Sequence, residues 1–251
     1  MVRIDDFFIA SNSVSNIPEE EYQKVNVLID AFEAVSRITY QSLYIIDYSK
    51  KNFLYVSNNP MFLCGHTAQE VKELGYMFYL NHIPEQEQTM LTEINAAGFN
   101  FYENVPVDEK IKCTISYDFH LVNGRKKMLV NHKLTPVLLT KNGRIWLAAC
   151  IVSLSTHTAP GHVAIRKTGQ TTLWEYSLKN HCWKENEEII LAERGKDILS
   201  LSAQGYTMNE IADRLCIALD TIKFHKRKIF DRLQVKNIAE ALSFATNYKL
   251  L

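Results

Sequence analysis

The spacing of apolar positions over the first hundred residues indicates a mixed α/β arrangement. Apolar side chains recur at helical spacing between positions 22 and 38, which predicts an amphipathic helix. Runs of β-branched and aromatic residues at 42–46 and 53–56 predict the two strands of a hairpin. Short helices are expected between 59 and 77, and a longer helix is expected from about 85 to 97, after a proline.

Three more strands are predicted downstream, at 113–121, 127–138 and 144–153. They are separated by Asn123-Gly124 and Asn142-Gly143, and Asn-Gly favours the tight turn of a β-hairpin. Three hairpin-linked strands form an antiparallel meander. Together with the first hairpin, they predict an α+β domain built on a five-stranded antiparallel sheet with helices.

The order of these elements resembles a PAS domain. Two strands, several short helices, one longer helix and three strands follow one another, and Asn59–Val71 is similar to that family's segment after its second strand. The resemblance covers about residues 36–155 and implies a sheet that cups a small-molecule or protein-contact pocket. We therefore expect residues 22–155 to be a PAS-like sensory or dimerisation domain for an unidentified ligand or partner. The aromatic residues between Phe53 and Phe101 line such a pocket or fill a core, and a core is the default expectation.

Two segments flank this domain. Residues 1–21 are mostly polar around the patch Phe7–Ile9, and they predict an N-terminal arm that is poorly ordered or docked on a partner. Residues 156–189 contain a second hairpin-like pair, at 163–166 and 172–176, and predict a linker with extra strands.

The last part of the chain, residues 190–251, has helical periodicity throughout. Four helices are expected, at about 194–203, 207–215, 219–233 and 237–248. Thr207 and Glu210 have the spacing of a capping box, in which a hydroxyl and a carboxylate each accept from a backbone amide. Helix, helix, short turn, basic helix and helix is the order of a helix-turn-helix module with a fourth helix appended.

The charge distribution singles out the third of these helices. The whole chain has 28 basic and 28 acidic residues, which argues against indiscriminate coating of nucleic acid. From Ile190 onward there are ten basic and seven acidic residues, and four of the basic ones lie between Lys223 and Lys228, where no acid occurs. The spacing buries Ile222, Ile229, Phe230 and Leu233, and leaves Lys223, Lys226 and Arg227 on the outward face.

Residues 190–251 resemble the LuxR-type (LuxR/FixJ/NarL-like) DNA-binding domain almost position by position. The matching residues include Glu210-Ile211-Ala212, Thr221-Ile222-Lys223, His225, Leu233, Val235, Asn237 and Glu240-Ala241. The resemblance implies that Thr221 and Lys223 contact the DNA backbone or a base edge, and that His225, Lys226 and Arg227 lie along the groove. It also implies that the last helix can pair two copies, so the expected partners are double-stranded DNA and a second copy of the chain.

Two positions depart from the family pattern. Gly195 stands where a glutamate usually follows the arginine of the first helix, and Ala218 stands where a serine usually caps the recognition helix. Loss of a cap costs about 0.5 to 2 kcal/mol of stability. These departures affect affinity more than fold.

Other classes of protein are disfavoured. The five cysteines are scattered without a C-x-x-C pair, which fits reduced thiols in a cytoplasmic protein, and no metal site is expected. No signal peptide or membrane span is recognisable, and no nucleophile, base or metal constellation suggests an enzyme. No cofactor is predicted.

These observations predict a sequence-specific, DNA-binding transcription regulator in which the PAS-like domain controls the helix-turn-helix. The alternative is a protein-interaction adaptor, with a PAS-like dimer interface and a helix-turn-helix that docks protein. The salt dependence of binding distinguishes them, because each phosphate contact contributes a slope of about −0.9 to log affinity against log salt.

Overall fold

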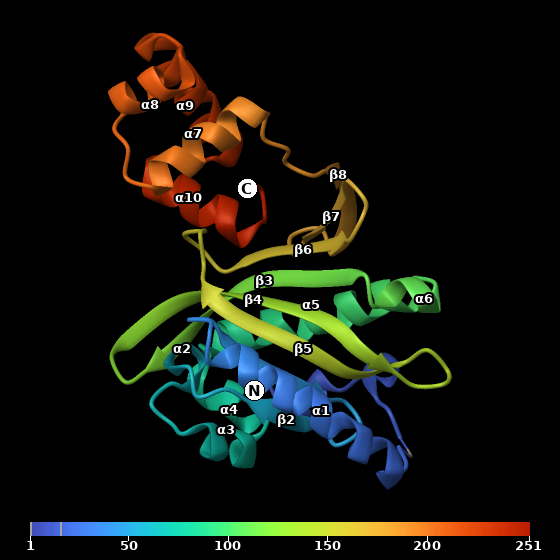
Figure 1. Ribbon diagram of the computed structural model, residues 1–251. Coiled ribbons are helices and arrows are strands. Elements are labelled where there is room, and N and C mark those ends of the chain that lie inside the picture. Colours follow the sequence, from blue (N-terminus) through green and yellow to red (C-terminus); the bar gives the residue numbers. More distant parts are fainter. Residues whose placement is uncertain (1, 16) are drawn as a thin grey trace. The chain divides into compact units, whose positions relative to one another are not determined.

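The computed structural model describes residues 2–15 and 17–251. The chain divides into two compact units, Met1–Asn186 and Glu187–Leu251. Each unit has a hydrophobic core of its own. Figure 1 shows the chain coloured along the sequence, with the mixed α/β unit in blue to yellow and the helical unit in orange and red.

The first unit is built on one sheet, and in the described part of the chain this sheet has eight strands. Its spatial order is β2-β1-β5-β4-β3-β6-β7-β8. The strands are β1 (Ser42–Asp47), β2 (Asn52–Val56), β3 (Cys113–Asn123), β4 (Lys126–Leu139), β5 (Ile145–Leu154), β6 (Gly161–Lys167), β7 (Thr172–Ser177) and β8 (Cys182–Glu187). Pairings from β2 across to β7 are antiparallel. All five predicted strands form and lie side by side.

The predicted limit of five strands is wrong. The extra strands expected in the linker form β6 and β7, a further strand β8 follows, and all three join the same sheet. β6 pairs with β3 from Cys113 opposite Lys167 to Asp118 opposite Gly161. The outer edge of β3 would otherwise expose unpaired backbone groups, which an added strand satisfies. Val163 and Ile165, which are 2% and 0% exposed, also bury apolar side chains in the core.

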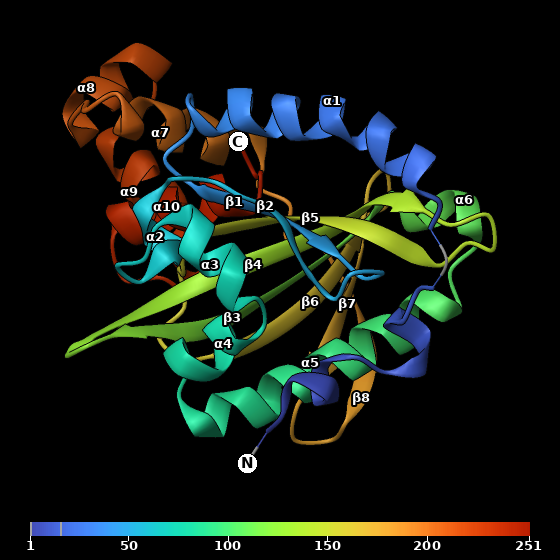
Figure 2. The same ribbon diagram turned by 90° about the horizontal axis from the view of Figure 1, so that it is seen from below.

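Helices cover both faces of the sheet. They are α1 (Glu19–Ser36), α2 (Pro60–Leu63), α3 (Ala68–Leu74), α4 (Met77–His82), α5 (Glu85–Glu103) and α6 (Val107–Lys110). Side chains alternate along β1, so Tyr44 and Ile46 join the core that includes residues of α2 to α5, whereas Leu43 and Ile45 pack with α1. In Figure 2, α1 and α5 lie on opposite sides of the strands.

The aromatic residues between positions 53 and 101 mostly fill the core, which was the default expectation for them. Phe53, Phe62 and Phe78 are at most 3% exposed. Phe62 stacks on Tyr44, with ring centroids 4.5 Å apart and planes within 14°. Phe101 is the exception, because it is half-buried at the edge of this core.

The described residues of the N-terminal arm pack on the first unit itself, which corrects the prediction of a poorly ordered or partner-docked arm. Two short 3₁₀ turns form, Ile4–Phe7 and Ala10–Asn12. Phe7 is 5% exposed and its ring lies 5.6 Å from that of Tyr76. The Asn95 side-chain amide donates to the Phe7 carbonyl oxygen over 2.8 Å. These contacts hold the described part of the arm in place, together with the Phe8–Tyr76 ring contact and the bonds from Arg144 to the Ala10 and Ser13 carbonyl oxygens.

Residues 187–251, all of which are described, form the four predicted helices. These are α7 (Glu193–Ala203), α8 (Met208–Leu215), α9 (Leu219–Leu233) and α10 (Ile238–Asn247). Every helix contributes fully buried side chains to one core, including Leu199, Ile211, Ile222 and Ala245. This core fixes the orientation of α9 relative to the other three helices.

Candidate nucleic-acid interface

The turn between α8 and α9 is set by local sequence. The predicted capping box opens α8: the Glu210 carboxylate accepts from the Thr207 backbone amide over 2.8 Å, and the Thr207 hydroxyl accepts from the Glu210 amide over 3.4 Å. Cys216 ends α8 in the left-handed conformation, with φ of 52°. Ala218 is the N-cap residue of α9, so only a short turn separates the two helices.

The buried face of α9 is narrow. Ile222, Ile229 and Leu233 are 0 to 4% exposed, and they recur at the spacing of one helical face. Phe230, which was expected among them, is half-buried. This face points into the core of the unit, so the opposite face is available to a partner.

The exposed face of α9 is basic. Lys223, Arg227 and Lys228 are all exposed there. Lys223 pairs with Asp220 over 2.9 Å, but the Asp220 side chain is 90% exposed and the Lys223 side chain 47% exposed. An exposed pair of this kind contributes about 0 to 1 kcal/mol and is screened by salt. Lys223 can therefore exchange this carboxylate for another anion at small cost.

The structure places the five predicted site residues, Thr221, Lys223, His225, Lys226 and Arg227, on one helix but not on one face. Lys223 and Arg227 are exposed on the outward face, whereas Thr221 and His225 are half-buried at its margins. Lys226 is also half-buried, with Nζ 5.6 Å from the centre of the Phe230 ring.

The predicted outward position of Lys226 is therefore wrong. Successive residues of a helix are turned by about 100°, so Lys226 stands close to the direction of Ile222 and Ile229. It lines a small hollow together with Tyr206 and Ile238. Its charge reaches solvent at the flank of α9, not at the centre of the exposed face.

Two residues of the exposed face were missed by the sequence analysis. Phe224 is 50% exposed, although it is a large aromatic residue. The Lys228 ammonium lies over its ring, 4.5 Å from the centroid. The signal was present in the spacing, because positions 224 and 228 are one turn apart and lie opposite Ile222 and Ile229. An apolar ring with cations beside it thus lies on the exposed face, which also carries the exposed carboxylates of Asp220 and Asp231.

The two departures from the family pattern have visible consequences. Ala218 precedes α9 with extended backbone angles, and alanine has no side-chain acceptor for the first amides of the helix. These amides carry the positive end of the helix dipole and suit an anion such as a phosphate. Gly195 is buried in α7, where a Cβ atom would lie 3.5 Å from Ile229 Cγ1.

Neither a metal site nor a membrane-spanning helix is found among the described residues. No group of three or more histidine, cysteine, aspartate or glutamate side chains there is placed to hold a metal ion. Among the helices that these residues form, none combines the length and apolar character needed to cross a bilayer.

Comparison with known proteins identifies the helical unit. Residues 190–245 match the family described as bacterial regulatory proteins, luxR family, and form a LuxR-type helix-turn-helix domain. The chain is also similar to the oxygen regulatory protein NreC of Staphylococcus carnosus (strain TM300), with 27% identity over 150 residues. That match covers 57% of this chain and 65% of the length of NreC.

Two solved structures match the chain with low identity and low TM-scores. The match to the phage VqmA–DPO complex has 16% sequence identity and a TM-score of 0.30, and it covers 93% of this chain and 92% of that chain. The match to the PAS domain of a protein from Colwellia psychrerythraea has 10% sequence identity and a TM-score of 0.38, and it covers 51% of this chain and 97% of that chain.

Proposed function

Residues 190–245 being a LuxR-type helix-turn-helix domain, we propose that this protein is a sequence-specific transcription regulator that inserts α9 into the major groove of double-stranded DNA. The observation that carries the proposal is the exposed face of α9, which presents Lys223, Arg227 and Lys228 beside Phe224 within a complete four-helix module. A major groove about 12 Å wide accepts one helix.

The exposed side chains have distinct tasks in this proposal. Lys223, Arg227 and Lys228 attract phosphates, and an arginine or lysine that reaches guanine adds about 1 to 3 kcal/mol of discrimination. Thr221 and His225 lie at the margins of the face and contact the sugar-phosphate backbone. Lys226, on the flank of the helix, supplies long-range attraction.

The first unit acts as the control element. We infer that residues 22–155 are a PAS-like domain that senses a ligand or partner, and that sensing shifts the population of chains able to bind DNA. The chain acts as a homodimer in the cytoplasm, with α10 as the pairing helix, and has no catalytic activity. Small side chains on the exposed positions of α10, Ala239 and Ser243 among them, favour close approach of a second helix.

Selection of genomic DNA fragments with the purified full chain tests the proposal. Wild type, Lys223→Ala and Arg227→Ala are compared, with Lys196→Ala as the matched control, because Lys196 is a basic residue of α7 that pairs with Glu193. We expect a shared sequence with two half-sites, weakened by both α9 substitutions and unaffected by the control. Absence of enrichment at low salt, with all four proteins folded, would contradict DNA binding by the chain as purified.

The alternative is an adaptor whose α9 docks protein. One observation favours it: Phe224 is an exposed aromatic residue, and such residues are enriched at the centres of protein interfaces. The two functions differ in salt dependence, because replacing phosphate contacts by an apolar contact flattens the slope of log affinity against log salt. A partner captured through α9 with a slope near zero would favour the adaptor.

A further inference from the structure

A groove of about 600 Å³ opens on the first unit, outside the core that the predicted five strands enclose. It lies between the C-terminal half of α5, the segment leading into α6, and the added strands β6 to β8. Its volume is within the range of small-molecule sites, about 300 to 1,000 Å³. The strands added to the predicted five thus provide one wall of a cavity.

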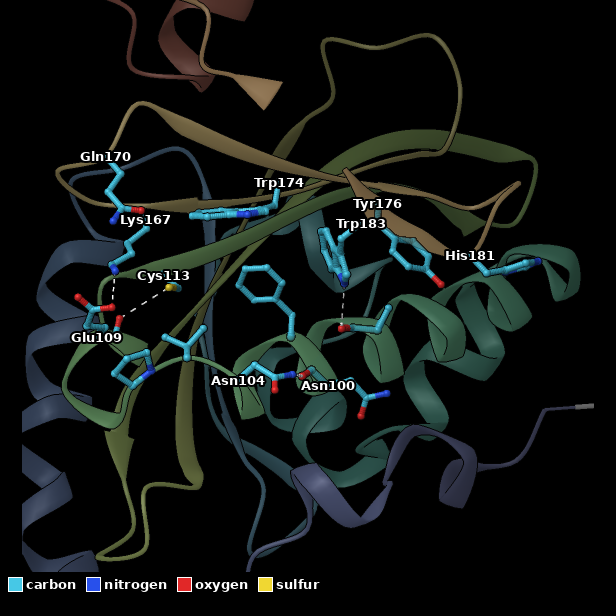
Figure 3. A pocket seen from close by; sticks show the side chains of 14 residues that line it. Asn100, Asn104, Glu109, Cys113, Lys167, Gln170, Trp174, Tyr176, His181 and Trp183 are labelled. Carbon is cyan, nitrogen blue, oxygen red and sulfur yellow. Dashed lines mark hydrogen bonds and ion pairs between the residues drawn. The ribbon is translucent and has the colours of Figure 1, made fainter. Parts of the chain in front are cut away.

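Four aromatic rings line the groove: Phe101, Trp174, Tyr176 and Trp183. All are half-buried. Phe101 meets Trp174 at 5.4 Å and Trp183 at 5.2 Å, and Tyr176 meets Trp183 at 5.1 Å, with interplanar angles of 57° to 61°. In each of these contacts the two rings are tilted toward each other, and none is a parallel stack. Figure 3 shows the Trp174 indole edge-on, spanning one side of the groove.

The charged groups at both ends of the groove already have partners. At one end, Lys167 is paired with Glu109. At the other end, Glu93 accepts from the Tyr176 hydroxyl over 3.1 Å and pairs with His181 over 2.6 Å. Figure 3 shows the Lys167–Glu109 pair and His181 at opposite ends. A charged ligand would have to break one of these pairs, whereas an uncharged ligand would not.

Amide side chains supply hydrogen bonds between those ends. Asn100, Asn104 and Gln170 line the groove and are exposed. The Asn104 side-chain nitrogen donates to the Asn100 carbonyl oxygen over 3.0 Å, which leaves the Asn104 side-chain oxygen as an acceptor. Primary amides offer donors and acceptors at once, so they suit the edge of a ring that contains both.

We propose that this groove binds a small, uncharged, planar heteroaromatic molecule. The ligand stacks on Trp174, its edge bonds to the amides, and the Lys167–Glu109 pair and the His181–Glu93 hydrogen bond stay closed. As a binding site the groove rests on this geometry; its use as the sensory site of the first unit rests on the proposed function.

The test is saturation-transfer NMR followed by titration of the full chain, without DNA. Two uncharged probes, quinolin-2(1H)-one and benzimidazol-2-one, are compared with 2-naphthoate and phenyltrimethylammonium, which carry a negative and a positive charge. We expect the uncharged probes to bind and both charged probes to bind more weakly. Preferential binding of the ammonium would overturn the proposal in favour of an aromatic cage for cations.

Variants locate the site. Trp174→Ala removes the stacking surface and should weaken binding by about 5- to 150-fold, the factor expected for loss of one ring stack. Asn104→Phe, at an exposed position, fills the groove without removing a core residue and should have the same effect. Tyr40→Ala is the control, because Tyr40 is an aromatic residue of this unit that is 69% exposed and is not among the lining residues of the groove.

Two further results would overturn the inference. One is no binding of either uncharged probe to the folded chain up to millimolar concentration. The other is binding that survives both Trp174→Ala and Asn104→Phe. Neither result bears on DNA binding. The ligand-binding proposal and the DNA-binding proposal are therefore tested by separate measurements, and the failure of one is distinguishable from the failure of the other.

Discussion

Substitution of Phe224 by alanine tests whether the centre of the exposed α9 face contacts bases. A phenylalanine buries about 150 to 250 Å² when fully covered, and Phe224 is 50% exposed in the free protein. Covering the exposed half removes roughly 75 to 125 Å² from water, which stabilises a complex by about 2 to 3 kcal/mol at 25 cal/mol per Å². We therefore expect Phe224→Ala to weaken binding to the selected operator by about 30- to 150-fold.

The nature of the contact predicts a second effect. In the major groove the apolar feature of a base pair is the thymine methyl group. Anisotropy titrations with thymines replaced one at a time by uracil should reveal a position at which wild type loses affinity and Phe224→Ala does not. The salt slope should not change, because the ring contacts no phosphate. Ile190→Ala is the control, since Ile190 is an apolar residue of the same unit that is 57% exposed and lies outside α9.

Equal affinity of Phe224→Ala and wild type for the operator would refute this reasoning. So would equal loss of affinity for operator and random DNA, because a base contact weakens specific binding alone. A changed salt slope would show that the Lys228 ammonium, which lies over the ring, moves when the ring is removed. The Lys228→Ala variant then separates the two contributions.

Four more outcomes are expected. Arg227→Ala should reduce the salt slope of DNA binding by about 0.9, measured by titration at several salt concentrations, whereas Lys226→Ala should reduce it less, because Lys226 is half-buried on the flank. Gly195→Ala should raise the free energy of unfolding by about 1 kcal/mol in urea titrations. The added methyl meets Ile229 at ordinary contact distance, and alanine has a higher helix propensity than glycine. A loss of stability would contradict this packing. Ala218→Ser should raise it by about 0.5 to 2 kcal/mol by capping α9, and no change would mean that water already satisfies these amides. Burial lowers the pKa of His132 to about 3, so this histidine is neutral in the folded protein but takes up a proton in the unfolded chain below pH 6.5. The free energy of unfolding should therefore fall by about 1.4 kcal/mol per pH unit as the pH is lowered from 6 to 4. In chemical denaturation, His132→Gln should lessen that slope.

Local features were predictable because they depend on neighbouring residues. The capping box of Thr207 and Glu210 forms because its groups are three residues apart in the sequence. The same holds for Thr67 and Glu70 at the start of α3. The five strands at 42–153 were found from β-branched runs and Asn-Gly turns, which also act over a few residues.

Features that depend on distant residues were not predictable in the same way. The strand Gly161–Lys167 has an alternating pattern that fits a linker hairpin as well as a sheet, and only the free edge of β3 decides between them. The groove along Trp174 and Trp183 requires α5, which lies about 70 to 90 residues earlier in the chain. No spacing rule connects these segments, so the groove was absent from the sequence analysis.

The position of Lys226 shows how a small angular error changes a functional assignment. The basic run Lys226-Arg227-Lys228 suggests three equivalent cations, but each residue is turned by about 100° from the last. The core fixes the direction in which each side chain of α9 points, because Ile222 and Ile229 are 0% and 4% exposed. Arg227 and Lys228 then point outward, while Lys226 is carried round to the side of Ile222. The residues that α9 buries therefore determine which residues form its exposed face. Phe224 lies on that face, although it is not basic.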